Sequence, residues 1–187
     1  MKSILEVMVA DHEKIVKLLH DVRKSVVLDN KILKKSFETF YWELEKHIFT
    51  EEKIIFTSYK PEDFNEGYKM VPNLMKEHNI IYKKLNEMRK KINSNKPCDF
   101  QEFKDILFKH KCFEEGHLYQ KLDQELDLKT KKMMIDRINE FKTTDGSLKK
   151  INIKCSECGK KIGIFKGYHH SKLEKRWFFC NECYNKI

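Results

Sequence analysis

Four separate segments of this 187-residue chain each contribute one histidine, and in two of them a glutamate follows four residues later. In chain order these residues are His12, His47 with Glu51, His78, and His110 with Glu114. Residues four apart lie on one face of an α-helix, offset by about 40° around its axis. Each pair can therefore direct both of its side chains into the interior of a helical bundle.

Apolar residues recur at helical spacing around all of these motifs, and only three prolines and six glycines interrupt the chain. The pattern predicts helices over about 4–27, 31–59, 99–122 and 127–141, and another that ends near Asn93. Pro72 marks either the first turn of that third helix or a position beyond an earlier start. Short loops between four long helices predict an all-α, up-down-up-down four-helix bundle.

Imidazole and carboxylate side chains that meet inside such a bundle form a mixed nitrogen and oxygen site suited to two iron ions. Neutral imidazoles should favour the ferrous state, and so favour the binding of small ligands such as O₂ or NO over strong oxidation. The order H…HxxxE…H…HxxxE resembles the hemerythrin-like (HHE) family over about residues 4–122. The resemblance implies two iron ions, joined by an oxo or hydroxo group when oxidised. It also implies six ligands, histidines that cap the irons and glutamates that bridge them: His12, His47, Glu51, His78, His110 and Glu114.

The chain departs from the oxygen-carrying hemerythrins at two positions. Tyr82 stands where they have a second histidine on the third helix, and Glu115 stands where they have an aspartate. The pattern is closer to bacterial iron-centre-repair and nitric-oxide-responsive members. Tyr82 is then either an additional iron ligand or a hydrogen-bonding or core aromatic residue.

Other residues near the motifs are expected to surround the ligands, to lie at the surface or to form the core. Glu52 and Glu115 are expected to contact the ligands from outside or to be exposed, and His117 is a less favoured candidate for a spare ligand. Cys112 is expected to pack off the ligand face. A set of aromatic residues is expected to form core around the metals: Tyr41, Trp42, Phe49, Phe56, Phe108 and Phe113.

Two C-x-x-C pairs near the C-terminus supply four thiolates: Cys155, Cys158, Cys180 and Cys183. Four cysteines at this spacing predict a tetrahedral zinc site in a small zinc ribbon. The alternative is iron in a rubredoxin-like centre. Residues 147–187 carry ten basic and three acidic side chains, so they hold +7 of the chain's net charge of +9. This basic surface could contact nucleic acid, a protein, or no partner.

These motifs divide the chain into a di-iron bundle at 1–142, a linker at 143–150 and a ribbon at 151–187. No apolar run approaches the length of a membrane span and no secretory signal is evident, so we expect a cytoplasmic protein. The predicted function is to bind or sense a diatomic ligand or iron under oxidative or nitrosative stress. Two alternatives remain: a peroxide or NO reductase whose tail supplies electrons, and a regulator whose ribbon responds to iron or oxygen. The sequence does not decide whether the protein is an enzyme.

Overall fold

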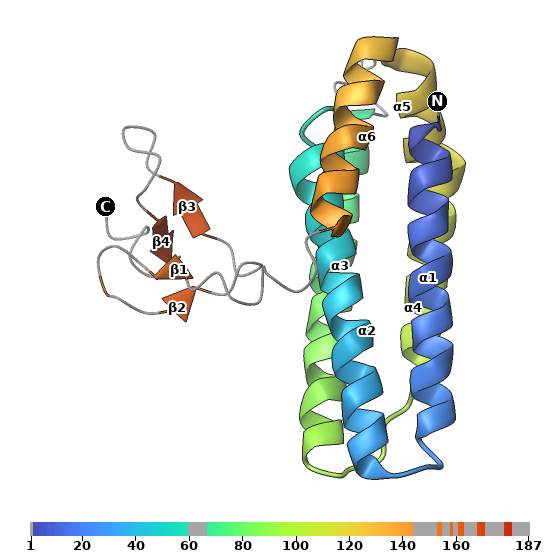
Figure 1. Ribbon diagram of the computed structural model, residues 1–187, viewed down its shortest axis with the longest axis vertical. Helices are drawn as coiled ribbons and strands as arrows, with labels where there is room; N and C mark the ends of the chain where they lie inside the picture. Colours follow the sequence, from blue (N-terminus) through green and yellow to red (C-terminus); the bar gives the residue numbers. More distant parts are fainter. Residues whose placement is uncertain are drawn as a thin grey trace. The chain divides into compact units, whose positions relative to one another are not determined.

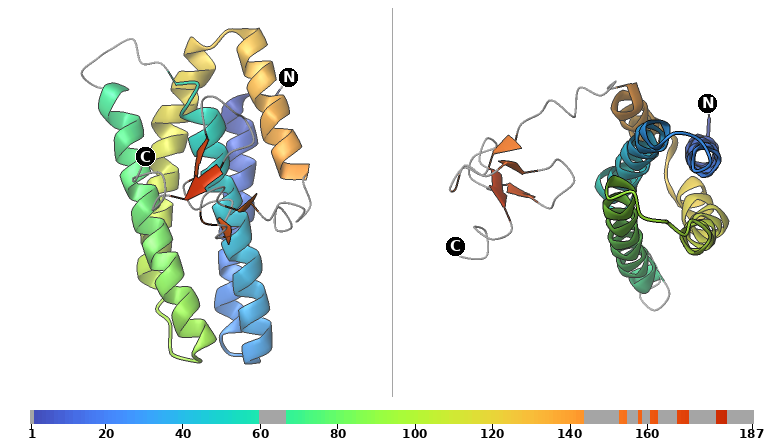
Figure 2. Two further views of the ribbon diagram at one scale, coloured as in Figure 1. Left: turned by 90° about the vertical axis from the view of Figure 1, so that its left-hand side faces the viewer. Right: turned by 90° about the horizontal axis from the view of Figure 1, so that it is seen from below.

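The computed structural model describes residues 2–59, 67–143, 153–154, 158, 161–162, 168–170 and 178–180. Its helical part consists of α1 (Ile4–Ser25), α2 (Asn30–Thr50), α3 (Gly67–Asn93), α4 (Gln101–Phe113), α5 (Tyr119–Glu125) and α6 (Leu128–Thr143). Two π-helical turns, η1 (Glu51–Ile55) and η2 (Glu114–Leu118), extend α2 and join α4 to α5. The helices stand side by side as a bundle (Figures 1 and 2), which confirms the predicted helical architecture.

The chain divides into two compact units, Met1–Asn139 and Glu140–Ile187. In the second unit β1 (Ile153–Lys154) pairs antiparallel with β2 (Lys161–Ile162), and β3 (Tyr168–His170) pairs antiparallel with β4 (Phe178–Cys180). The predicted boundaries at 142 and 150 stay a prediction. Among the helices that the structure describes, none combines the length and the apolarity that crossing a membrane requires.

The start of α1 is fixed by two kinds of cap. The Ser3 hydroxyl accepts a hydrogen bond from the Glu6 amide at 3.0 Å, and the Glu6 carboxylate accepts one from the Ser3 amide at 2.8 Å. This is a capping box, which satisfies amides that the helix itself leaves unpaired. In addition, the Asp123 carboxylate accepts hydrogen bonds from the amides of Ile4 and Leu5 at 3.0 and 2.9 Å. Asp123 thereby ties the end of α5 to the start of α1.

The apolar core of the bundle is split into two clusters. The turn-side core lies toward the α1–α2 turn and comprises Ile15, Leu19, Val22, Phe37, Phe40, Tyr41, Leu44, Ile48, Ile81, Leu85, Met88, Ile92, Phe100, Phe103 and Leu107. The α6-side core comprises Ile4, Val7, Met8, Ile55, Phe56, Tyr59, Leu74, Leu118, Tyr119, Leu122, Met134, Ile135 and Ile138. On α1, α3 and the α4 segment the predicted ligands fall between these two sets, and on the α2 segment Glu51 does so while His47 lies beside Ile48, the last turn-side residue.

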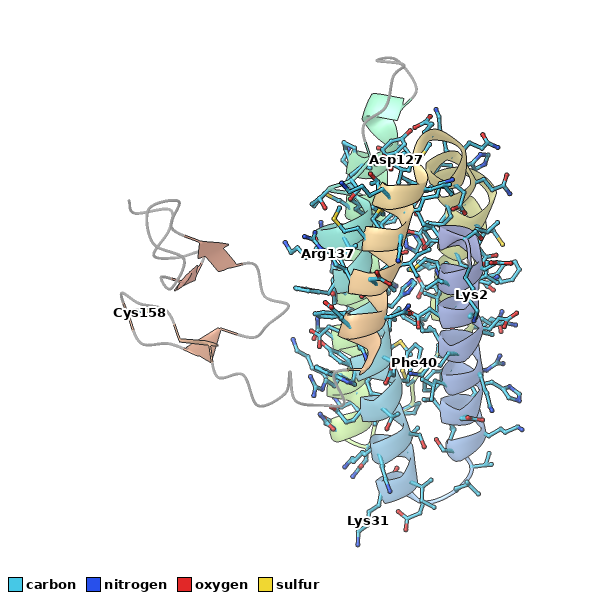
Figure 3. The ribbon with its side chains drawn as sticks, turned by 45° about the horizontal axis from the view of Figure 1, so that its top comes forward. Lys2, Lys31, Phe40, Asp127, Arg137 and Cys158 are labelled. Atoms are coloured by element: carbon cyan, nitrogen blue, oxygen red, sulfur yellow. The ribbon has the colours of Figure 1, made fainter. Side chains whose placement is uncertain are left out.

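The observed helices follow the predicted ones closely, with a few differences. The third helix begins at Gly67, so Pro72 lies inside it, as the earlier-start alternative held. Two of the aromatic residues assigned to the core were placed wrongly: Phe108 is 55% exposed and Phe113 is 38% exposed. The buried face of α4 passes through Phe103, Leu107 and His110, and the neighbouring positions turn toward solvent. Charged side chains such as Lys31 also project from the bundle (Figure 3).

Candidate metal centre

The six residues predicted as iron ligands meet inside the bundle in a single polar layer between the two apolar clusters. They form two overlapping groups of potential ligand atoms that lie within 4.8 Å of one another: His12, His47, Glu51 and Glu114, and Glu51, His78, His110 and Glu114. All six are buried, with exposures of 0–3%. The two glutamates belong to both groups, so the layer contains two histidine pairs that share one pair of carboxylates.

Glu51 presents one carboxylate oxygen to each histidine pair. Its Oε1 atom lies 3.4 Å from His47 Nε2, and its Oε2 atom lies 3.3 Å from His78 Nε2. A carboxylate held in this way can bind a different cation with each of its oxygens.

Glu114 repeats the arrangement from the opposite side of the bundle. Its Oε2 atom lies 3.4 Å from His12 Nε2, and its Oε1 atom lies 3.2 Å from His110 Nε2. Within the pairs, the rings of His12 and His47 are 4.6 Å apart and those of His78 and His110 are 4.8 Å apart. The geometry is therefore that of two adjacent cation positions, each with two imidazole nitrogens and two carboxylate oxygens.

In each of the four histidines of the polar layer, Nδ1 points outward and bonds to a carboxylate on another helix. The four Nδ1 contacts are His12 to Glu115 at 2.8 Å, His47 to Asp11 at 3.1 Å, His78 to Glu52 at 3.0 Å, and His110 to Glu77 at 2.8 Å. Because a carboxylate accepts hydrogen bonds, each contact places a proton on Nδ1, and in the neutral imidazole this leaves the lone pair of Nε2 facing inward. We call Asp11, Glu52, Glu77 and Glu115 the outer carboxylates.

The outer carboxylates connect the helices in a closed circle. The helix of His12 supplies Asp11 to the histidine of α2, and the η1 turn supplies Glu52 to the histidine of α3. In turn, α3 supplies Glu77 to the histidine of α4, and η2 supplies Glu115 back to His12. Each helix therefore orients the ligand of the next helix.

The buried carboxylates of the polar layer favour positive charge beside them. Burial opposes ionisation of Glu51, yet the charge of His47 and the close approach of His78 hold the pKa of its carboxyl below the usual range. Burial also disfavours charge on His78, but the close approach of the carboxylates of Glu114, Glu51 and Glu52 raises the pKa of its imidazole to about 11. The same kind of competition, dominated on the raising side by Glu51, raises the pKa of His47. Cations can supply the charge that these protons otherwise provide.

Three inward-facing atoms support the same conclusion. Within the described residues, His12 Nε2, Glu51 Oε2 and Glu114 Oε1 are buried and have no partner in hydrogen-bond geometry. A buried polar atom without a partner is costly, and a buried carboxylate oxygen especially so. Because imidazole nitrogens and carboxylate oxygens are ligands that suit iron, the residues fit the cation pair that the sequence predicted.

A tyrosine that the sequence did not suggest also reaches the layer. The Tyr119 hydroxyl donates hydrogen bonds to Glu51 Oε1 and, at 3.4 Å, to Glu114 Oε2. Its side chain is fully buried, and burial together with the charges of Glu114 and Glu51 raises the pKa of Tyr119 well above its usual value. The phenol therefore retains its proton as a neutral donor.

Tyr82 lies elsewhere. It is partly buried and packs against the turn-side core, and burial and the charge of Glu45 raise the pKa of its hydroxyl. This placement suits the core aromatic that was one alternative for Tyr82. Its role as an additional iron ligand stays a prediction.

Both HxxxE motifs end in a π-helical turn that starts at the glutamate. The Phe56 amide donates to the Glu51 carbonyl at 2.8 Å, and the Tyr119 amide donates to the Glu114 carbonyl. Such turns insert one extra residue into a helix and occur frequently at functional sites. Here both turns begin at the glutamates that belong to the polar layer.

The positions of the outer carboxylates could have been predicted from a pattern in the sequence. Each of them is the immediate neighbour of a ligand: Asp11 precedes His12, Glu52 follows Glu51, Glu77 precedes His78, and Glu115 follows Glu114. For Glu52 and Glu115 the two alternatives were contact with the ligands from outside or exposure, and the structure shows the contact, on helices that the sequence did not identify. Tyr119 had no comparable signal.

Two further residues near the motifs are exposed. His117 is exposed and contacts the ring of Phe113 at 4.8 Å, so it does not line the polar layer. Cys112 is exposed and does not pack in the core. Both residues lie beside the buried face of their helical segment, where neighbouring positions rotate away by about 100° per residue.

The predicted zinc ligands lie largely beyond what the structure describes. Cys155 and Cys183 lie outside the described residues, Cys158 is an exposed residue in a turn, and Cys180 is the last residue of β4. The four-cysteine site therefore stays a prediction.

Comparison with known proteins identifies one family. The model described as Hemerythrin HHE cation binding domain matches residues 3–122, which include all six residues of the polar layer. No curated protein and no solved structure matches the chain.

Proposed function

The chain belongs to the hemerythrin HHE cation-binding family, and from this premise we propose that its polar layer holds two iron ions that bind or sense a diatomic ligand. The observation that carries the proposal is the placement of Glu51 and Glu114, each with one oxygen toward each histidine pair. Four histidines and two shared carboxylates give each iron four protein ligands. Iron in this setting would supply open coordination positions for O₂ or NO.

The protein's own residues would hold the pair and exclude water from it. The outer carboxylates fix the imidazole rings, and hydrogen bonds of this kind raise the basicity of a ligating histidine. The turn-side core and the α6-side core close the layer from both ends of the bundle. Imidazole-rich ligation favours ferrous iron, which suits reversible binding or sensing, including sensing of iron itself.

The first experiment is elemental analysis of anaerobically prepared protein, paired with its optical spectrum before and after exposure to air. Two irons per chain, with near-ultraviolet charge-transfer bands of a ferric pair after oxidation, would support the iron proposal. Zinc without iron would refute it. Anaerobic addition of NO then tests ligand binding, and an unchanged spectrum at full iron content would refute that part alone.

Turnover distinguishes binding from reduction at the same centre. Sustained consumption of peroxide or NO with an added electron donor would favour the reductase alternative. Consumption of no more than one equivalent per iron pair would favour a binding or sensing protein.

For the C-terminal unit we propose a zinc ion held by Cys155, Cys158, Cys180 and Cys183. The supporting observation is the spacing of the two C-x-x-C pairs. Replacing Cys155 with serine should remove about one zinc per chain and leave the bundle's iron in place, whereas a thiolate–iron spectrum would favour the rubredoxin-like alternative. The basic charge of residues 147–187 supports nucleic acid as a partner, which salt-sensitive binding to a duplex would test.

A further inference from the structure

The turn between α1 and α2 exposes a run of apolar side chains at one end of the bundle. Val27 is 86% exposed and Leu28 is 61% exposed, and Val26 and Ile32 beside them are each 48% exposed. Single apolar residues at a surface are ordinary, but consecutive exposed ones are unfavourable unless they serve a function. A cluster of this kind marks an interaction site.

Basic side chains surround this apolar cluster. The α1–α2 turn and the α3–α4 turn lie at the same end of the bundle (Figure 1), where Lys31 projects (Figure 3). Residues 23–35 and 90–99, which form this end, include eight basic and two acidic residues. All eight basic side chains except that of Lys34 are exposed. We call these two stretches together the basic end.

Charge is distributed unevenly along residues 1–146. The basic end has a net charge of +6, whereas the remaining residues up to 146 have a net charge of −4. The two acidic residues of the basic end, Asp29 and Asp99, accept hydrogen bonds from the amides of Lys31 and Gln101 at 2.6 and 2.7 Å. They therefore lie at the starts of α2 and α4, where each helix compensates part of their negative charge. The basic end thus concentrates positive charge around an apolar tip.

The backbone of the α1–α2 turn already satisfies hydrogen-bonding groups that would otherwise need water. The Val26 amide donates to the Arg23 carbonyl at 3.3 Å, and the Leu28 amide donates to the Ser25 carbonyl at 3.1 Å. A polar group that leaves water without a partner costs free energy. These internal bonds therefore lower the cost of moving the turn into an apolar medium.

An anionic lipid surface offers both of the environments that the basic end requires. Phosphate groups at the surface attract lysine and arginine, and the acyl chains just below accept apolar side chains. The C-terminal residues 147–187 have a net charge of +7, so charge opposes them as a cover for this end. The charges and the apolar tip together favour a membrane surface as the partner.

We propose that the basic end binds an anionic membrane surface, with Val27 and Leu28 inserted among the lipid head groups and the surrounding lysines beside the phosphates. The protein lies on the surface in this arrangement and does not span it. The inference goes beyond the proposed iron centre and does not depend on it.

The test measures sedimentation of the full-length protein with vesicles of mixed phosphatidylglycerol and phosphatidylcholine, and with vesicles of phosphatidylcholine alone. We expect binding to the anionic vesicles that weakens as salt is added, because salt screens the attraction, and little binding to the neutral vesicles. Val27→Ser combined with Leu28→Ser should weaken binding about tenfold or more, because it removes the apolar tip and keeps the charge. Lys31→Gln combined with Lys35→Gln should have an effect of similar size.

Each pair of substitutions has a matched control elsewhere in the chain. Leu128→Ser combined with Met133→Ser removes two side chains of α6 that are 74% and 49% exposed. Lys149→Gln combined with Lys150→Gln removes the same charge from the C-terminal unit. Both controls should bind anionic vesicles as the natural protein does, and a loss in either as large as that in the basic end would contradict the proposal.

Two other results would overturn it. Equal binding by the basic-end variants and the natural protein would show that another surface holds the vesicles. Failure of the natural protein to sediment with anionic vesicles at low salt would leave an acidic protein as the alternative partner of this end. Circular dichroism checks that the variants fold. If the serine variant does not fold, Lys31→Gln with Lys35→Gln decides the question, because it changes only exposed side chains.

Discussion

The turn-side core and the polar layer lie on the same four helical segments, but removal from water affects them in opposite ways. It stabilises the apolar side chains of the core and costs free energy for the charged and polar side chains of the layer. In the turn-side core, Phe40, Leu44 and Ile81 are almost fully buried and need nothing beyond their neighbours, because removing apolar surface from water is favourable in itself. In the polar layer, buried carboxylates and imidazoles have been taken out of water without full compensation. One region therefore specifies the bundle, and the other specifies what the bundle can bind.

The largest effect should come from removing a shared carboxylate. Glu51→Ala deletes an oxygen from both cation positions, so iron content should fall from two per chain to less than one. Elemental analysis of anaerobically prepared protein measures this directly. Two irons retained after both Glu51→Ala and Glu114→Ala would show that the ligand set is wrong.

A substitution in the turn-side core should lower the stability of the fold and leave the iron content unchanged. Leu44→Ala should lower the free energy of unfolding by about 2–5 kcal/mol, because it leaves a cavity among well-packed side chains. Its iron content should stay at two per chain. Urea denaturation gives the first quantity, and a stability equal to that of the natural protein would contradict the assignment of Leu44 to the core.

Removing the metal should destabilise the natural protein by mass action alone. A ligand present at 100 times its dissociation constant stabilises the folded state by about 2.7 kcal/mol. A chelator should therefore lower the unfolding temperature of the natural protein and leave that of Glu51→Ala unchanged. An equal response from both proteins would show that the chelator acts outside the polar layer.

The outer carboxylates should give the smallest of these effects. Glu77→Gln removes the charge that holds His110 Nδ1, and changes of this kind typically weaken metal binding by about 10- to 100-fold. Glu102→Gln is the matched control, since Glu102 forms an exposed pair with Lys84. Cobalt titration should separate the two variants, and equal affinities would remove the outer carboxylates from the metal site.

The sequence was sufficient for features that depend on local spacing. The i to i+4 relation between His47 and Glu51, and between His110 and Glu114, follows from helix geometry alone, and so did the convergence of ligands inside a bundle. Features that depend on which helices face one another could not be predicted from the sequence. The partner of each outer carboxylate lies on another helix, and nothing along the chain states which one.

Tyr119 and Tyr82 both show how far local spacing can identify residues near the polar layer. Tyr82 lies four residues after His78, so local spacing left it open as either a ligand or a core aromatic residue. Tyr119 lies five residues after Glu114, a spacing that a regular α-helix would turn away from the ligand face. The π-turn at Glu114 changes that relation, and sequence periodicity alone did not reveal the turn.

The two π-turns also have a consequence for the phase of the helices. Beyond each glutamate the buried positions advance in steps of four, from Glu51 to Ile55 to Tyr59 and from Glu114 to Leu118 to Leu122. In a regular α-helix each step of four overshoots a full turn by about 40°, so two steps would drift by about 80°. Each π-turn contains one extra residue, which compensates for this drift and keeps the buried positions facing the core. Deleting a single exposed residue such as Lys53 should convert η1 into ordinary α-helix and keep the residues beyond it in phase with the core. The same deletion inside α1 or α3 would rotate half of a helix away from the bundle.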